Sequence, residues 1–144
     1  MKKDVLISIK GIEQVDGQSD SIELMTCGRF YRKNNDYYLS YDESETTGFA
    51  GHHTTLRIEG MNRVTLRRTG LTTSQLIIEK GCRHHCVYNT GYGAITVGIC
   101  GDSIKSTLSD AGGELDFSYS MDIDAALASV HRVIISVKEC NPLC

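Results

Sequence analysis

Proline is almost absent from this 144-residue sequence, since the only one is Pro142 near the carboxyl end. A proline in a central strand removes a donor from the ladder, so the rest of the chain is free to form β-strands. An excess of positive charge is also missing, because the formal net charge is −3 and basic residues are spread among acidic ones. This distribution argues against a protein that binds nucleic acid or an anionic membrane surface.

Long apolar runs are missing too. The amino-terminal stretch MKKDVLISIKG is interrupted by Ser8 and Lys10, whereas a signal peptide needs a continuous apolar segment and a spanning helix needs about 20 apolar residues. We therefore expect a cytoplasmic protein with no membrane contact, in which the six cysteines are reduced thiols. The length and the hydrophobic content of 40% predict one globular domain over residues 1–144, with residues 139–144 as a flexible tail.

Apolar residues at alternating positions dominate the chain, a pattern typical of half-buried β-strands. Examples are Val5, Ile7 and Ile9, then Tyr37, Leu39 and Tyr41, and then Val64 and Leu66. Short turns that contain glycine or asparagine separate these segments, and sequential hairpins favour an all-β, antiparallel, up-and-down closed β-barrel of about 8–10 strands. The one helical candidate lies near residues 122–131, where Asp122 or Asp124 would cap a run rich in alanine.

Four segments together resemble a known family. They are YRKNNDYYLSYDESETTGFAG, TTLRIEG, SQLIIEKGCRHHCVYNTGYGAITVGI and GGELDFSYSMDI. In this order they are similar to the YwiB-like family of small bacterial proteins of unknown function. The resemblance covers nearly the whole chain, and it implies a lipocalin-like (calycin-type) β-barrel in a bacterial cytoplasm. It implies no catalytic residues, because none is assigned in that family.

Two cysteines and two histidines are crowded in the segment GCRHHCVYNTGYG, residues 81–93. If the segment is extended, Cys82, His84 and Cys86 project to one face, which makes them candidates for metal ligands. Zinc needs at least three protein ligands, and no turn residue lies between the two cysteines, so we predict packed side chains and no cofactor. An enzyme that uses His84, His85 and Cys86 is the alternative, although a nucleophilic thiolate needs a lowered pKa.

The segment SYDESETTGFAGHHTT, residues 40–55, carries three acidic residues, Asp42, Glu43 and Glu45. It has neither the spacing of a calcium-binding EF-hand nor an identifiable pair of glycosidase carboxylates. We therefore interpret it as a solvated acidic loop. Because its glycines offer little packing, we expect a flexible flap over one mouth of the barrel.

Several polar residues occupy the same alternating strand positions as the apolar residues that we expect to face the interior. Arg68 continues the inward phase of Val64 and Leu66, and a buried guanidinium requires a carboxylate, an anionic ligand or access to water at the rim. The residues in register to join it are Tyr37, Tyr41, Tyr88, Tyr119 and His84. A cavity with an apolar body and a few polar tips is typical of a small-molecule site, whereas the alternative is an interior filled by side chains.

The predicted function is therefore that of a non-catalytic protein that binds a small, partly apolar ligand, with an anionic group as one option. Arg68 would hold the anionic group, and Tyr37, Tyr88 and His84 would be its hydrogen-bond partners. An enzyme is the less favoured interpretation. A third interpretation is a homodimeric scaffold that pairs through an edge or a face of the barrel.

Overall fold

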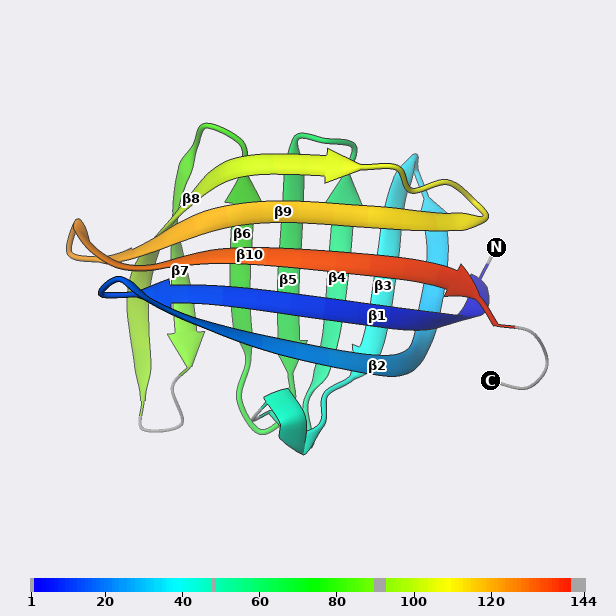
Figure 1. Cartoon of the computed structure of the whole chain (residues 1–144), viewed down its shortest axis with the longest axis horizontal. Coiled ribbons are helices and arrows are strands. Elements are labelled where there is room, and N and C mark those ends of the chain that lie inside the picture. Colours follow the sequence, from blue (N-terminus) through cyan, green and yellow to red (C-terminus); the bar gives the residue numbers. More distant parts are fainter. Residues whose placement is uncertain (1, 48, 90–92, 141–144) are drawn as a thin grey trace.

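Ten strands and one turn of 3₁₀ helix are present in the computed structural model, which describes residues 2–47, 49–89 and 93–140. The strands are β1 (Lys2–Val15), β2 (Gln18–Lys33), β3 (Asp36–Asp42), β4 (His53–Glu59), β5 (Arg63–Thr69), β6 (Ser74–Glu79), β7 (Arg83–Asn89), β8 (Ala94–Ser106), β9 (Gly112–Ile123) and β10 (Ala126–Glu139). The 3₁₀ turn η1 (Glu45–Thr47) lies between β3 and β4 (Figure 1). None of the described residues forms a helix long and apolar enough to cross a membrane.

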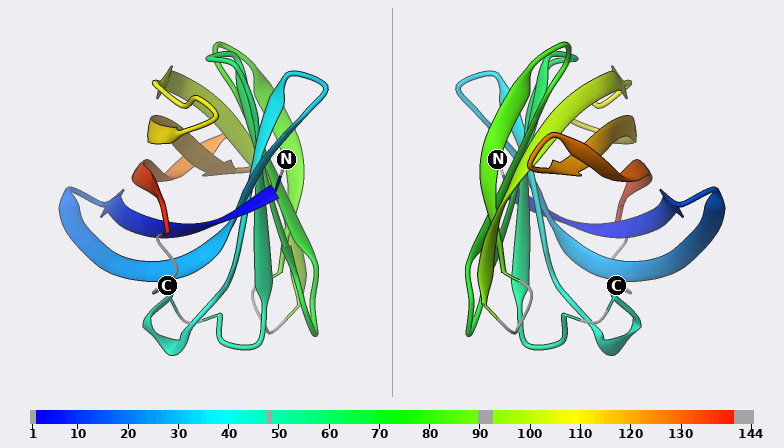
Figure 2. Two further views of the ribbon diagram at one scale, coloured as in Figure 1. Left: turned by 90° about the vertical axis from the view of Figure 1, so that its right-hand side faces the viewer. Right: turned by 90° about the vertical axis from the view of Figure 1, so that its left-hand side faces the viewer.

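The strands form one antiparallel sheet in the order β6-β5-β4-β3-β2-β1-β10-β9-β8-β7. From β1 to β9, each strand except β6 pairs with the next one along the chain. The first and last strands also pair, from Val5 opposite Glu139 to Gln14 opposite Val130. The long strands β1, β2, β9 and β10 run across the shorter strands behind them (Figure 1), and the β1–β2 ribbon curves away from the other layer (Figure 2). The predicted all-β, up-and-down barrel is confirmed.

Between β6 and β7 the barrel is held by their connection, because no ladder joins these two strands in the described part of the chain. The backbone nitrogen of Gly81 donates to Gly101 O over 3.1 Å, and Gly101 N donates to Cys82 O over 3.3 Å. A Cβ at Gly101 would lie 2.3 Å from the backbone oxygen of Glu79. Only glycine allows two backbones to approach so closely, so Gly101 is required where the barrel nearly closes.

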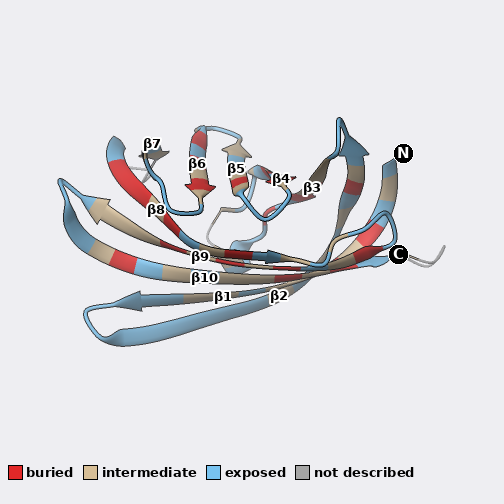
Figure 3. Cartoon of the chain, turned by 90° about the horizontal axis from the view of Figure 1, so that it is seen from above, coloured by how far each residue is buried: buried red, intermediate tan, exposed pale blue. Residues whose placement is uncertain are grey.

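Inward side chains of both layers form one apolar core. The largest fully buried side chains are Phe30, Phe117, Ile7, Leu39, Leu56, Ile58, Ile78, Ile99, Leu115, Ile135, Val5 and Val64. Figure 3 shows buried segments, in red, on strands of both layers. Each such side chain contributes about 1.5–3 kcal/mol when it leaves water, so the alternating pattern of the sequence is also the main source of stability.

Three hairpins have two-residue turns in which both residues have positive φ. They are Asp16-Gly17, Asn34-Asn35 and Asp124-Ala125, with φ between 50° and 77°. Two positive φ values are typical of type I′ turns, whose twist matches that of the flanking strands. These turns therefore fix the register of the long antiparallel pairs.

At most one short helix was expected, near residues 122–131, and this candidate segment forms none. The segment forms the end of β9, the Asp124-Ala125 turn and the beginning of β10. Asp122 Oδ1 accepts a hydrogen bond from Ala125 N over 3.2 Å, which fixes the turn locally. The preference of alanine for helix is worth less than about 1 kcal/mol per residue, and β10 pairs with a strand on each side, so the ladders decide the outcome.

The flexible tail predicted for residues 139–144 is wrong for its first two residues. Glu139 ends β10, and Cys140 N donates to Asp4 O over 3.1 Å. Residues 141–144 lie outside the described residues, so the rest of this prediction is not tested.

Two of the five cysteines that the structure describes are oxidised. Cys27 and Cys140 are disulfide-bonded, whereas Cys82, Cys86 and Cys100 are free thiols. The prediction that all six cysteines are reduced is therefore wrong for these two, because it depended only on the expected compartment.

Candidate functional site

A cavity of about 250 Å³ lies inside the barrel. Its apolar walls include Ile9, Leu24, Leu66, Met121 and Val133, and its polar groups include Tyr41, Glu43, Arg68, Tyr88, Tyr119 and His131. A space of this size can hold several water molecules or one small organic molecule. The barrel interior is thus only partly filled by side chains.

The cavity opens toward the tip of the β1–β2 hairpin. Glu13 and Ile22 line it there with exposed fractions of 56% and 45%. Only the part of β2 from Gly28 to Lys33 pairs with β3, so the rest of β2 leaves that layer (Figure 3). A Cβ at Gly28 would lie 2.3 Å from Ser40 O, so glycine is required where β2 turns away.

Arg68 and Glu43 form a buried ion pair deeper in the cavity. Arg68 Nη2 and Nε lie 3.1 Å and 3.2 Å from Glu43 Oε2, and Thr54 Oγ1 donates to the same oxygen over 3.0 Å. The guanidinium also lies over the ring of Phe49, 3.8 Å from its centroid, an arrangement that attracts the cation to the ring. Three donors and a ring face therefore hold the two charges in one geometry.

The pair follows from the register of β3, β4 and β5. Thr54 lies directly opposite Arg68 in one ladder and opposite Tyr41 in the other. Glu43 follows Tyr41 by two residues and so keeps its inward phase beyond the end of β3. A hydrogen bond of 2.9 Å from Glu43 N to His52 O extends the strand pairing to this position.

The solvated loop predicted for residues 40–55 is correct for Asp42 and Glu45 and wrong for Glu43. The Asp42 side chain is 91% exposed and Glu45 is exposed, whereas the Glu43 side chain is 1% exposed. The alternation of inward and outward side chains that includes Tyr41 continues to Glu43. This alternation was the sequence signal that could have predicted the burial of Glu43.

Glu43 Oε1 is buried and has no hydrogen-bond partner, the only such side-chain nitrogen or oxygen in the described part of the chain. The bonds from Arg68 and Thr54 all go to Oε2. An unpaired buried polar atom costs about 1–3 kcal/mol, and most proteins contain few of them. An acceptor left unpaired beside a cavity is therefore a candidate contact for a ligand.

Burial favours the uncharged form of three titratable side chains that line the cavity. It raises the pKa of Tyr119, and burial together with the Glu43 charge raises the pKa of Tyr41. Burial also lowers the pKa of His131, which stacks on Tyr119 with 4.8 Å between ring centroids. The described lining residues also include one guanidinium, that of Arg68, and two carboxyl groups, those of Glu43 and Glu13.

Two of the four predicted ligand-binding residues line the cavity, namely Arg68 and Tyr88. Tyr37 lies elsewhere in the barrel, where its hydroxyl donates to Asp110 Oδ1 over 3.2 Å. His84 lies near the β6–β7 connection and is not among the lining residues. The inward phase alone did not reveal how far along the barrel each of these side chains lies.

Two residues of the cysteine–histidine cluster contact the same carboxylate, that of Glu79. Cys82 Sγ donates to Glu79 Oε2 over 3.4 Å, and His84 Nε2 lies 3.1 Å from Glu79 Oε1. Cys86 is buried, and its Sγ accepts from Ile77 N over 3.4 Å. The bond to Glu79 raises the pKa of Cys82, and burial raises that of Cys86, so neither has the lowered pKa of a nucleophile. No three described His, Cys, Asp or Glu residues are grouped closely enough to hold a metal ion.

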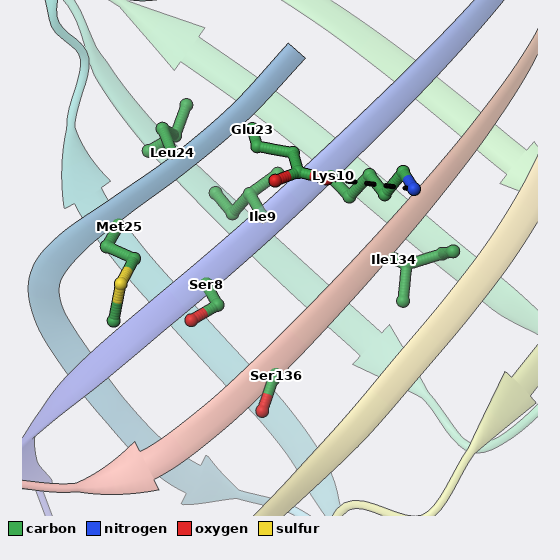
Figure 4. Close-up of a pocket in the computed structure, with 8 residues that line it drawn as sticks. All are labelled: Ser8, Ile9, Lys10, Glu23, Leu24, Met25, Ile134 and Ser136. Carbon is green, nitrogen blue, oxygen red and sulfur yellow. Dashed lines mark ion pairs between the residues drawn. The ribbon is translucent and has the colours of Figure 1, made fainter. Parts of the chain in front are cut away.

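A second hollow, of about 420 Å³, lies on the outer face of β1, β2 and β10 (Figure 4). Lys10 and Glu23 form an ion pair of 3.7 Å across it, with exposed fractions of 47% and 73%, and Met25 beside them is 66% exposed. These side chains are largely solvated. Although this hollow is larger, the interior cavity is the stronger candidate, because it has a buried and fixed polar end.

Comparison with known proteins supports the fold and assigns no activity. The crystal structure of the ywiB protein from Bacillus subtilis matches with a TM-score of 0.84 and 23% sequence identity, over 97% of this chain and 94% of that chain. At that identity the likeness shows the fold alone. The uncharacterized beta-barrel protein YwiB of Bacillus subtilis (strain 168) is 24% identical over 132 residues, which cover 92% of this chain and 91% of the relative. The model of the family described as "Domain of unknown function (DUF1934)" matches residues 7–135. The resemblance found in the sequence is confirmed, and this chain belongs to the DUF1934 family.

Proposed function

We propose that this protein binds a small, partly apolar ligand inside the barrel and catalyses no reaction on it. The observation that carries the proposal is the cavity of about 250 Å³ beside the Arg68–Glu43 pair, with one carboxylate oxygen unpaired. Apolar walls supply binding energy in proportion to buried area, while a few fixed polar groups supply orientation. The ligand would pack its apolar body against Leu24, Leu66 and Val133 and direct its polar end to Glu43.

Glu43 changes the role that the sequence suggested for Arg68. The guanidinium already has a carboxylate partner at 3.1 Å, so an incoming anion would share it with Glu43 or displace Glu43. Displacement would leave a carboxylate that is 1% exposed without its counter-charge, which is strongly unfavourable. We therefore assign Arg68 the role of positioning Glu43 for the ligand.

Gly11 offers a way to fill the cavity without straining the barrel. It lines the cavity on β1, and a Cβ at this position would meet no other atom within 4 Å. Gly11→Phe is therefore expected to fold and to occupy the space of the ligand. Ile12→Phe is the matched control, because the neighbouring side chain on a strand points to the opposite face.

Binding can be measured by saturation-transfer NMR with 2-phenylethanol as the probe, because this one-ring alcohol has an apolar body and one polar end. We expect signal transfer from the wild-type protein and from Ile12→Phe, and its loss in Gly11→Phe. Equal transfer from Gly11→Phe and the wild type would mean that the probe binds elsewhere, and the proposal would be wrong.

The enzyme alternative has less support. His85 lies on the opposite face of β7 from His84 and Cys86, since side chains alternate along a strand, and Cys86 is buried. A thiol and a histidine that act together must lie within hydrogen-bonding reach of each other. The partner of His84 is instead Glu79.

Homodimerisation and a cytoplasmic location stay predictions. From Gln18 to Cys27, β2 pairs with β1 and has no ladder on its other side in the described part of the chain. An exposed strand edge of this kind can add a strand from a second copy, and light scattering at two concentrations would detect the dimer. Because disulfides are rare in the cytosol, the redox state of Cys27 and Cys140 in protein taken directly from cells tests the location.

A further inference from the structure

The hydrogen-bonding capacity left in the cavity indicates the polarity of the ligand, and this step rests on the function proposed above. Arg68 directs Nη2 and Nε to Glu43 Oε2 at 3.1 Å and 3.2 Å. Glu43 lines the cavity, and its buried Oε1 has no partner. The buried group that lacks a bond is therefore an acceptor, and a ligand that satisfies it must bring a donor.

The charges around the cavity favour a cation. Glu43 and Glu13 are the carboxylates in its lining, and Arg68 is the only cationic side chain among the described lining residues at neutral pH. A positively charged ligand would bring two positive charges to two negative ones. An anion would instead add a second negative charge beside the single guanidinium, where the Glu43 carboxylate is almost fully out of water, while Glu13 adds a third at the more exposed mouth.

Aromatic rings around the acceptor are also suited to a cation. Tyr41, Phe49, Tyr88 and Tyr119 all line the cavity. Their ring faces carry negative potential and attract ammonium groups. Because burial raises the pKa of Tyr41 and Tyr119, these hydroxyls keep their protons and the rings stay neutral.

We infer that the ligand is a small organic amine, whose protonated nitrogen donates a hydrogen bond to Glu43 Oε1 while its apolar body fills the cavity. An ammonium has three donors and no acceptor, so it complements a site whose unpaired groups are acceptors. A neutral alcohol supplies one uncharged donor and binds less tightly. A carboxylate supplies only acceptors and leaves Oε1 unpaired.

Three probes with the same ring separate these cases. They are 2-phenylethylamine, 2-phenylethanol and phenylacetate, titrated into the wild-type protein at pH 7 by calorimetry. A hydrogen bond to a charged group is worth about 1.5–3 kcal/mol, so the amine should bind at least about tenfold more tightly than phenylacetate, with the alcohol between them.

Glu43→Gln tests whether the preference comes from this carboxylate. The variant should lose about tenfold in affinity for the amine and gain affinity for phenylacetate, because Arg68 loses its counter-charge. Glu45→Gln is the matched control, since it removes one negative charge from an exposed position in η1, two residues away. Glu43→Asp keeps the charge and should keep the preference, which provides a second variant if the glutamine variant does not fold.

The outcomes separate this inference from the proposed function. If phenylacetate binds the wild type as tightly as the amine, and Gly11→Phe abolishes both, the cavity is a binding site but the ligand is not an amine. If Glu43→Gln and Glu45→Gln weaken the amine equally, the attraction is general and the assignment to Glu43 is wrong. If no probe shows binding that Gly11→Phe abolishes, both the inference and the proposed function are overturned.

Discussion

Arg68→Met tests whether the buried ion pair holds the site together. The Glu43 side chain is 1% exposed and that of Arg68 is 14% exposed, so the variant would leave a carboxylate almost fully out of water, with Thr54 Oγ1 as a remaining donor. Removing one partner of a buried pair costs about 3–5 kcal/mol. Because Arg68 keeps some contact with solvent, we expect the lower end of this range, about 3 kcal/mol.

The size of the effect is measurable in a chain of this length. Each 1 kcal/mol lowers Tm by roughly 3 °C in a domain of about 150 residues, so Arg68→Met should lower Tm by about 10 °C. The double variant Arg68→Met with Glu43→Leu removes both charges and leaves apolar side chains. Since such replacements are often neutral, it should lie within about 1 kcal/mol of the wild type.

Urea unfolding of the four proteins of this cycle gives the free energies of unfolding. The chain has seven tyrosines and no tryptophan, so tyrosine fluorescence and far-UV circular dichroism can follow the transition. The cycle isolates the coupling between the two residues. If Arg68→Met is as stable as the wild type, the ion pair does not hold Glu43 in place. If the double variant is as unstable as the single one, the loss reflects packing and not an uncompensated charge.

Three further predictions concern other parts of the barrel. Gly101→Ala should lose about 2 kcal/mol or more in urea unfolding, because its Cβ would lie 2.3 Å from a backbone oxygen; wild-type stability would contradict the account of closure. His131→Phe should flatten the pH dependence of the unfolding free energy. Burial lowers the pKa of His131 from 6.5, so its contribution is complete above about pH 6.5 and is lost as the pH falls through the folded pKa; an unchanged slope would refute this. Iodoacetamide should label the exposed Cys82 before the buried Cys86, as mass spectrometry would show; equal rates would be inconsistent with the burial.

The barrel was predictable because its signal is local. Alternation in each segment gives the inward face, and residue pairs such as Asn34-Asn35 set the hairpin turns. Alanine content made residues 122–131 a helical candidate, but it says nothing about the strands that lie on either side. Two ladders on either side of β10 outweigh a helix preference that is small for each residue.

The site was only partly predictable, because it depends on contacts between distant segments. The alternating pattern of its strand predicted that the Arg68 side chain points inward. Its charge predicted that it needs a partner there, because a buried guanidinium without one is costly. The partner was missed, since Glu43 lies beyond the end of a strand in a segment with the composition of a solvated loop. Tyr37 and His84 occupy inward positions of the alternating pattern but lie away from the cavity. The pattern predicts the direction of a side chain and not its position along the barrel.

The most direct test of binding inside the barrel is a map of backbone amide shifts during titration with 2-phenylethylamine. We expect the largest changes at residues around the interior cavity, among them Tyr41, Arg68 and His131. Changes confined to the outer hollow around Lys10 and Met25, with the interior residues unaffected, would contradict it.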